Sequence, residues 1–344
     1  MQAILSTQHG PQNVYLRTID DPPAELKSDE VVIKVSSVGV CGSDIHVYHG
    51  TESFAMDYPV VLGHEMCGIV ERVASQVTDF FVGDRVVSET AFRVCGACLN
   101  CREGRYNLCS QRRGFGAAVN GGMAERVLTR AAILHHVPDG VSDVSAALTE
   151  PTCVAYQAVV VNAGIQPGDV VAIIGPGPIG LMALQVTKLV CPSYIAMVGT
   201  PRDGSRLALA REWGADAVFD NVDTARDGLR SVGWADGVDV VIDAAGVAAT
   251  VQLALDIVRP GGCITKIGWD SHPLNLSLDP LVAKAVRLQG SFSHTWSTWE
   301  RVLRLLGRHS LRPELMAETF PLANWEQAFQ RMGSQVIAKA VLTL

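Results

Sequence analysis

The segment of residues 169–188, with the sequence DVVAIIGPGPIGLMALQVTK, constrains the fold of this chain more than any other. An apolar run typical of a β-strand leads into a glycine-rich turn and then into a helical pattern. This is the order of a dinucleotide-binding βαβ unit. Strand-like and helix-like runs continue to alternate at βαβ spacing after about residue 150. We therefore expect an α/β fold in which residues 151–288 form a Rossmann domain, a doubly wound parallel sheet.

The glycine-rich turn is the expected binding site for the pyrophosphate of a dinucleotide. Small residues let a pyrophosphate approach the N-terminus of the following helix. The same glycines would also suit a simple tight turn between a strand and a helix, so the prediction depends on the surrounding strand and helix. The expected contacts come from Gly175, Gly177, Pro178, Ile179 and Gly180.

The rest of the chain is β-rich and irregular in its pattern. Residues 30–40 form a β-type run, and glycine and proline punctuate the segments that follow. A chain of 344 residues exceeds what one hydrophobic core usually supports. Two short amphipathic helices are expected in residues 299–311 and 324–332. We expect residues 1–150 and 289–344 to form one domain, into which the Rossmann domain is inserted.

Composition and charge limit the kinds of partner. The net charge of -7 argues against binding of a nucleic-acid backbone, which favours a basic face. The N-terminus lacks the pattern of a signal peptide, and no apolar run reaches the roughly 18 residues that a membrane helix needs. We expect a cytoplasmic protein that acts on a small molecule, without a nucleic-acid or membrane partner. In that compartment, clustered cysteines are more often metal ligands or redox groups than disulfides.

Four of the nine cysteines lie within the short polar loop of residues 93–110. Their spacing, C-x2-C-x2-C-x7-C, lets four thiolates surround one Zn²⁺ ion tetrahedrally, which leaves no position for water or substrate. Such a zinc ion is structural, and folding of the loop would depend on it. An iron–sulfur site or a cysteine-rich surface loop is the alternative. The expected ligands are Cys95, Cys98, Cys101 and Cys109.

A second set of candidate ligands contains one thiol, one imidazole and two carboxylates. Such a mixed set leaves room for water or substrate on zinc, as a catalytic site requires. Each residue alone is a weak signal, because lone cysteines and histidines are commonly buried structural residues. The set consists of Cys41, His64, Glu65 and Glu150.

The motifs GVCGSDIH, GHE, the four-cysteine loop, EP..VA and GPGPIG follow one another in this order. The chain thereby resembles the zinc-dependent medium-chain alcohol and polyol dehydrogenases over nearly its whole length. It looks most like the sorbitol (L-iditol) dehydrogenase branch, because Glu150 stands where the alcohol dehydrogenase branch has a third zinc-binding cysteine. The resemblance implies a GroES-like catalytic domain, with catalytic zinc held by Cys41, His64 and Glu65. Glu150 would bind it directly or through water, and Cys153 is a rival ligand.

The resemblance also implies a proton relay. Ser43 matches the residue that accepts the proton of the alcohol, and His46 matches the one that passes the proton to solvent. Asp44 matches a carboxylate that orients the His64 ring. The same segment would also suit the start of a helix, with Ser43 or Asp44 as a cap and His46 exposed.

We expect a nicotinamide cofactor, NAD or NADP, and the residues after the second strand of the Rossmann domain favour NADP. Gly199 occupies the strand end where NAD-using relatives have aspartate. Asp203 could reach back to a ribose hydroxyl and restore NAD use, and the arginines of this loop could instead be solvated surface charges. A 2'-phosphate would be bound by groups from Thr200, Arg202, Ser205 and Arg206.

The substrate is less constrained. Phe115 resembles an aromatic residue that lines the pocket of polyol dehydrogenases. Residues 290–300 lack the arginine of sorbitol dehydrogenases and offer Ser293 and His294 instead, so a different polyol or sugar, or a vicinal diol, is open. A threonine-type or butanediol-type dehydrogenase is the alternative enzyme, and a non-catalytic nucleotide-binding relative is the alternative of another class. The resemblance suggests a homo-oligomer, a tetramer or dimer, with strands near 261–268 and 287–293 as interface.

Overall fold

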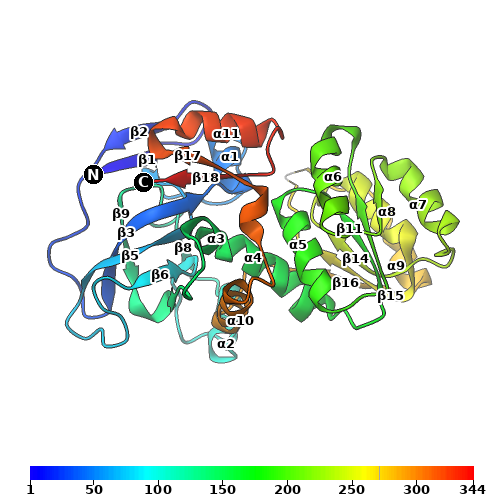
Figure 1. The fold of residues 1–344 in the computed structure, drawn as a ribbon, viewed down its shortest axis with the longest axis horizontal. Coiled ribbons are helices and arrows are strands. Elements are labelled where there is room, and N and C mark those ends of the chain that lie inside the picture. Colours follow the sequence, from blue (N-terminus) through cyan, green and yellow to red (C-terminus); the bar gives the residue numbers. More distant parts are fainter. Residues whose placement is uncertain (271) are drawn as a thin grey trace. The chain divides into compact units, whose positions relative to one another are not determined.

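The computed structural model describes residues 1–270 and 272–344 and divides into two compact units (Figure 1). The first unit consists of Met1–Glu150 and His294–Leu344, and the second of Pro151–Ser293. The chain thus returns to the first unit at His294 and not at 289. The reason is that strand β16 (Arg287–Gly290) pairs in parallel with β15 (Val258–Lys266) and so belongs to the second unit.

The first unit is built mainly from antiparallel strands, and its C-terminal segment adds one parallel pair, β17 and β18. Its largest sheet has the strand order β10-β6-β5-β3-β18-β17, with β9 also paired to β3. The last strand in sequence, β18, therefore lies beside β3. The strands of this sheet are β3 (Glu30–Gly39), β5 (Glu65–Val73), β6 (Arg85–Ser88), β9 (Arg126–Arg130), β10 (Leu134–His136), β17 (Ala317–Pro321) and β18 (Lys339–Thr343).

Two smaller sheets and several helices complete the first unit. The sheet β2-β1-β4 consists of β1 (Gln2–Ser6), β2 (Val14–Thr18) and β4 (Val60–Val61), and β7 (Ala91–Arg93) pairs with β8 (Arg113–Gly114). The helices are α1 (Gly42–His49), α2 (Leu99–Arg102), α3 (Asp143–Ala147), α10 (Trp296–Gly307) and α11 (Trp325–Gly333), and α4 (Thr149–Tyr156) begins in this unit. The two expected amphipathic helices correspond to α10 and α11.

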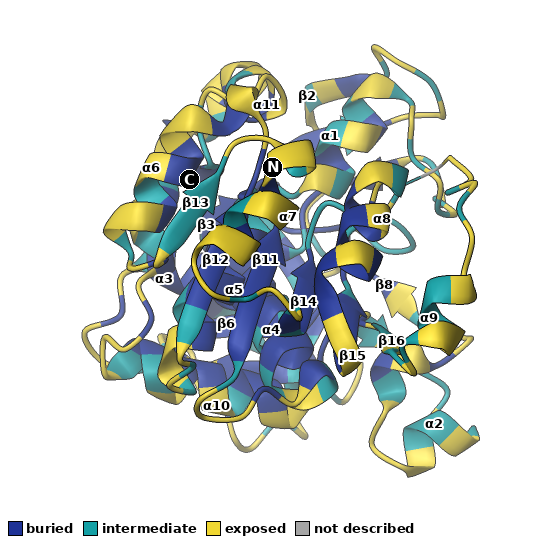
Figure 2. Cartoon of the chain, turned by 90° about the vertical axis from the view of Figure 1, so that its right-hand side faces the viewer, coloured by how far each residue is buried: buried dark blue, intermediate teal, exposed yellow. Residues whose placement is uncertain are grey.

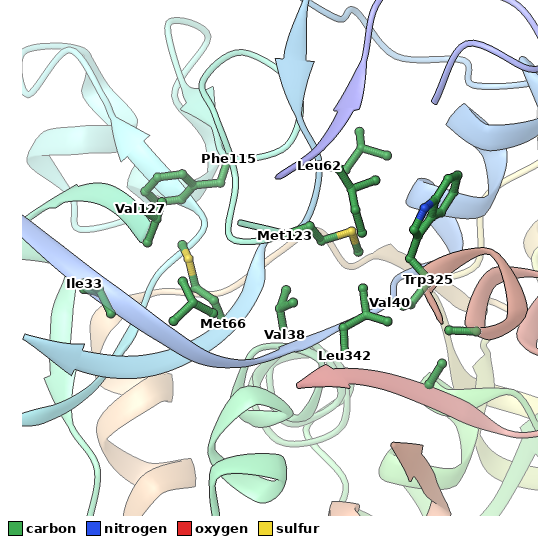
Figure 3. Close-up of a cluster of buried hydrophobic side chains, with 14 of the residues drawn as sticks. Ile33, Val38, Val40, Leu62, Met66, Phe115, Met123, Val127, Trp325 and Leu342 are labelled. Atoms are coloured by element: carbon green, nitrogen blue, oxygen red, sulfur yellow. The ribbon is translucent and has the colours of Figure 1, made fainter. Parts of the chain in front are cut away.

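The core of the first unit collects apolar side chains from both ends of its sequence. Strand β3 supplies Ile33 and Val38, and β18 supplies Leu342 (Figure 3). Trp325 comes from α11, whose buried residues recur at the three- and four-residue spacing of an amphipathic helix. The C-terminal segment is thus fixed to the sheet by apolar burial, which is the dominant favourable contribution to folding.

The second unit is a doubly wound parallel sheet of strand order β13-β12-β11-β14-β15-β16. The strands β11, β12 and β14 are buried, whereas outer helix faces are exposed (Figure 2). The remaining strands are β11 (Val170–Ile174), β12 (Tyr194–Val198), β13 (Ala217–Phe219) and β14 (Val238–Asp243), and the helices are α5 (Pro178–Leu189), α6 (Gly204–Glu212), α7 (Val222–Ser231), α8 (Ala248–Ile257) and α9 (Asp279–Ala283). The strand order reverses at β11 and β14, where such sheets bind dinucleotides.

Candidate active site

Three of the predicted ligands of the catalytic zinc lie together in the first unit. The ligand atoms of Cys41, His64 and Glu65 all lie within 4.8 Å of one another. Cys41 follows β3 and precedes α1, and Glu65 is the first residue of β5, directly after His64. Because β3 and β5 are antiparallel neighbours with Gly39 opposite Glu65, the end of one strand lies beside the beginning of the other. A sulfur, a nitrogen and an oxygen donor are suited to Zn²⁺.

The helix that follows Cys41 begins with a side-chain cap. The backbone N–H of Cys41 donates a hydrogen bond to Asp44 Oδ2 at 2.8 Å. Burial raises the pKa of Asp44, while the nearby His64 partly opposes the shift. Asp44 therefore fixes the backbone at Cys41, and its influence on His64 is electrostatic. Ser43 is half-buried, and the exposed His46 has its Nδ1 at 3.0 Å from Thr51 Oγ1.

Glu65 has a partner that the sequence analysis missed. The Lys339 ammonium lies 2.7 Å from Glu65 Oε1 and 2.6 Å from Oε2, and it also donates to the carbonyl oxygen of Val40 at 2.7 Å. Both charged side chains are buried. Burial raises the pKa of Glu65, and Lys339 opposes this shift. The only sequence signal for Lys339 is a lysine within the apolar strand β18.

Glu150 is held by a buried histidine. Its Oε1 lies 3.0 Å from His294 Nε2, and the indole N–H of Trp299 donates to His294 Nδ1 at 2.6 Å. Burial would raise the pKa of Glu150, but the hydrogen bond with His294 and the nearby His64 and Lys339 lower it. Glu150 is not among the residues whose ligand atoms lie within 4.8 Å of one another. The structure places His294, expected in the substrate pocket, as the partner of Glu150.

The electrostatics at His64 indicate an excess of negative charge. Burial, the largest single effect, would lower the pKa of His64, but Cys41, Asp44 and Glu150 together outweigh it and raise the pKa to about 10. Negatively charged groups around one imidazole favour a positive charge at that position. A divalent metal ion would satisfy that preference while the imidazole stays neutral as a ligand.

The four cysteines of the loop also lie together. The sulfurs of Cys95, Cys98, Cys101 and Cys109 are within 4.8 Å of one another, and all four are free thiols. The backbone N–H of Cys98 donates to Cys95 Sγ at 3.3 Å, and that of Cys95 to Cys109 Sγ at 3.4 Å. Hydrogen bonds from the backbone of Ala97 and Cys98 lower the pKa of Cys95 to about 6. Four sulfur donors with N–H groups directed at them fit a structural zinc ion.

The glycine-rich turn of the second unit has the geometry that a dinucleotide requires. Gly175 directly follows β11 and has a φ of +96°, which favours glycine. A Cβ on Gly180 would lie 1.9 Å from the carbonyl oxygen of Gly175. Gly177 is the N-cap of α5, and Pro178 is its first residue, so the helix begins with open backbone N–H groups.

In the loop after β12, the acidic residue Asp203 is engaged in hydrogen bonds within the loop. Asp203 Oδ2 accepts hydrogen bonds from the backbone N–H and the hydroxyl of Thr200 at 3.0 and 2.8 Å. Asp203 Oδ1 lies 3.6 Å from the guanidinium of Arg206, which is only 7% exposed. Arg202 is exposed. A Cβ at Gly199 would lie 2.9 Å from Pro176 Cγ and 3.3 Å from Asp203 Cβ, so the loop leaves little room for an aspartate there.

Phe115, predicted to line the substrate pocket, is buried in the first unit. It is 3% exposed and belongs to the core of the first unit, with Met66 and Val127 in the same cluster (Figure 3). Its ring packs edge to face on Phe92 at a centroid distance of 5.5 Å. These contacts account for its burial, and its place in the substrate pocket stays a prediction.

A parallel-sheet nucleotide fold and a cluster of thiol, imidazole and carboxylate define a metal-assisted oxidoreductase. Residues 27–139 match the model of the alcohol dehydrogenase GroES-like domain, and residues 178–308 match that of zinc-binding dehydrogenases. The chain belongs to the zinc-dependent medium-chain alcohol and polyol dehydrogenases. It is an enzyme that uses zinc and a nicotinamide cofactor to transfer hydride to or from an alcohol.

Individual relatives cover nearly the whole chain. The sorbitol dehydrogenase of Halalkalibacterium halodurans is 35% identical, covering 100% of this chain and 99% of its own. The D-arabitol-phosphate dehydrogenase of Enterococcus avium is 37% identical, over 91% of this chain and 90% of its own. The crystal structure of a zinc-binding dehydrogenase from Sinorhizobium meliloti bound to NADP has a TM-score of 0.89 at 30% identity, covering 100% and 99% of the two chains. Among the described residues, no helix is long and apolar enough to cross a membrane.

Proposed function

We propose that the enzyme interconverts a secondary alcohol of a polyol or sugar with the corresponding ketone. The observation that carries this proposal is the Cys41–His64–Glu65 cluster with Glu150 on a buried histidine. Two relatives named for polyol substrates, sorbitol and D-arabitol phosphate, support the substrate class. Zinc held at the cluster would act as a Lewis acid that stabilises the alkoxide.

A panel of substrates with both cofactors tests the proposal. It contains polyols of four to six carbons, their phosphates, threonine and 2,3-butanediol. We expect the largest kcat/KM for a polyol, a sugar or one of their phosphates. A larger kcat/KM for threonine or butanediol would favour the alternative enzyme and contradict the polyol assignment.

We also propose that a second zinc ion is structural and is held by Cys95, Cys98, Cys101 and Cys109. The convergence of four free sulfurs supports it. The same free thiols support a reducing, cytoplasmic location.

Ser43 and His46 are proposed to carry the proton of the alcohol to solvent. The two residues lie three positions apart on α1, which places them on one helix face. Ser43→Ala should lower kcat by roughly 100-fold or more, the effect of a positioned proton acceptor, while zinc content stays unchanged. His46→Ala should lower kcat mainly at acidic to neutral pH, where bases in solution are scarce. Unchanged turnover of Ser43→Ala across the pH range would leave its hydroxyl a structural role only.

NADP is proposed as the preferred cofactor. Gly199 removes the carboxylate that would repel a 2'-phosphate, and Asp203 is engaged by Thr200. The guanidinium of Arg202 is exposed and accessible to a phosphate, whereas that of Arg206 lies beside the Asp203 carboxylate. The NADP bound to the relative from S. meliloti supports the choice.

Arg202→Ala should raise the KM for NADP by about tenfold or more, as the loss of a charge-assisted hydrogen bond implies. The KM for NAD should barely change. Arg211→Ala, an exposed arginine near the end of α6, is the matched control for a lost surface charge. Measurements at fixed ionic strength keep screening constant. A wild-type preference for NAD, weakened selectively by Asp203→Ala, would contradict the assignment.

A homo-oligomer is proposed, formed through strand β16. This strand is at the edge of the parallel sheet, and Leu288 and Phe292 on and beside it are exposed. An exposed edge strand presents unpaired backbone groups that favour pairing with another chain. We expect light scattering to give the mass of a dimer or tetramer, and Leu288→Arg to reduce it. A monomeric wild type would contradict this proposal.

A further inference from the structure

The buried group formed by Glu150, His294 and Trp299 has a defined pattern of hydrogen-bond donors. The indole N–H of Trp299 can only donate, so the Nδ1 atom of His294 must accept. A neutral imidazole then carries its proton on Nε2, which faces Glu150 Oε1 at 3.0 Å. The contact is therefore an N–H of His294 donating to a carboxylate oxygen of Glu150.

We propose that His294 is a positioning residue for Glu150, and that Trp299 holds His294 in the tautomer that can donate to it. The inference rests on the proposed function, because it takes Glu150 as a group that acts on the zinc at the Cys41 cluster, directly or through water. A glutamate side chain has three rotatable bonds, and a buried carboxylate without a donor is costly. The hydrogen bond from His294 thus selects one orientation of Glu150.

Trp299 is itself held in place by stacking. Its ring is parallel to that of His135, with centroids 5.4 Å apart and an interplanar angle of 6°, and it meets His294 edge to face at 81°. His135 lies between two carboxylates, with Nε2 at 3.3 Å from Glu89 Oε1 and Nδ1 at 2.9 Å from Glu300 Oε1. Rotation of the indole would break this stack as well as its hydrogen bond.

The network of side-chain contacts that supports Glu150 extends to the four-cysteine loop. The hydroxyl of Tyr106, which lies between Cys101 and Cys109 in sequence, donates to Glu89 Oε2 at 2.7 Å. Glu89 contacts His135, on which Trp299 stacks. The tyrosine of the predicted structural zinc loop is therefore connected, through buried side chains of the first unit, to the carboxylate beside the catalytic cluster.

The test compares His294→Leu with His294→Gln. Leucine removes both hydrogen bonds, whereas the amide of glutamine offers an oxygen that can accept from Trp299 and a nitrogen that can donate to Glu150. Two readouts are needed: the Kd for zinc at the catalytic cluster, from chelator competition, and the visible absorption of Co²⁺ in the same site. The Co²⁺ contribution of the catalytic site is isolated as the difference between each protein and its Cys41→Ser form.

We expect His294→Leu to raise the catalytic-site Kd by about 10- to 100-fold, the range for partners that orient metal-binding groups. It should also shift the cobalt absorption and lower kcat more than it changes KM. His294→Gln should recover most of all three properties. A purely structural role for His294 predicts instead that stability changes while the cobalt absorption does not.

Trp299→Phe keeps an aromatic ring against His135 but removes the indole N–H, and it decides the question if His294→Leu fails to fold. It should raise the Kd for zinc by at least about threefold and shift the cobalt absorption. Trp325→Phe, in the core of the same unit on α11, is the matched control for a smaller aromatic ring and should change neither.

The possible failures are distinguishable. If wild-type protein shows no cobalt absorption that depends on Cys41, the proposed zinc site is wrong. If that absorption is present in the wild type and the folded His294 and Trp299 variants match it in affinity and absorption, the positioning role is overturned while the proposed function stands.

Discussion

Replacing Cys41 with serine is expected to remove about one of two zinc ions per chain and to lower kcat by roughly 1,000-fold or more. Serine binds zinc far less well than a thiolate, and the loss of a Lewis acid costs several kcal/mol of transition-state stabilisation. The far-ultraviolet circular dichroism should stay unchanged, because Cys41 caps a helix whose start is also fixed by Asp44. Metal analysis and steady-state kinetics on the purified protein measure both effects.

Two cysteine variants serve as controls for this experiment. Cys153→Ser tests the rival ligand and should leave two zinc ions, since Cys153 is not in either cluster of ligand atoms found among the described residues. Cys98→Ser should instead remove the other zinc ion and impair folding, because its loop has four sulfurs that converge on one point. A Cys41→Ser protein with normal zinc content and turnover would show that the catalytic assignment is wrong.

The sequence predicted the parts of the site that depend on local pattern. Cys41, His64 and Glu65 lie at the ends of two strands that pair as neighbours, and short motifs mark both ends. The alternation of strands and helices predicted the doubly wound sheet, because each βαβ unit is set by a few tens of residues. The sequence pattern placed the return to the first unit at residue 289 and not at His294. A short exposed strand such as β16 has no strong pattern of its own, so its membership of the second unit could not be recognised.

The supporting residues could not be predicted, because their contacts join distant parts of the chain. Lys339 contacts Glu65 across 274 positions, and His294 contacts Glu150 across 144. Each is a single polar residue whose burial depends on how the C-terminal segment closes the sheet. The sequence also could not distinguish the exposed Arg202 from the buried Arg206, since only the fold places Asp203 beside one of them.

The second large effect is expected from Lys339→Met, measured in the Cys41→Ser background so that no catalytic zinc binds Glu65. The Glu65 carboxylate is then buried without its ammonium partner. Methionine fills a similar volume, so the main change is electrostatic. Breaking a buried ion pair by removing one partner typically costs about 3–5 kcal/mol. For a unit of this size, that cost corresponds to a fall in Tm of roughly 6–20 °C. Thermal unfolding followed by circular dichroism measures it.

The pH dependence and a compensating variant identify the cause of this destabilisation. With Lys339 gone, burial raises the pKa of Glu65 in the folded protein above its ordinary value of 4.5. The folded state then binds a proton more tightly than the unfolded state, so the Tm deficit should be small below about pH 4.5 and should grow as pH rises above it. The double variant Glu65→Gln/Lys339→Met removes both charges and should recover most of the Tm at neutral pH. If the double variant is as unstable as Lys339→Met and the deficit does not change with pH, the loss comes from packing and not from the unpaired carboxylate.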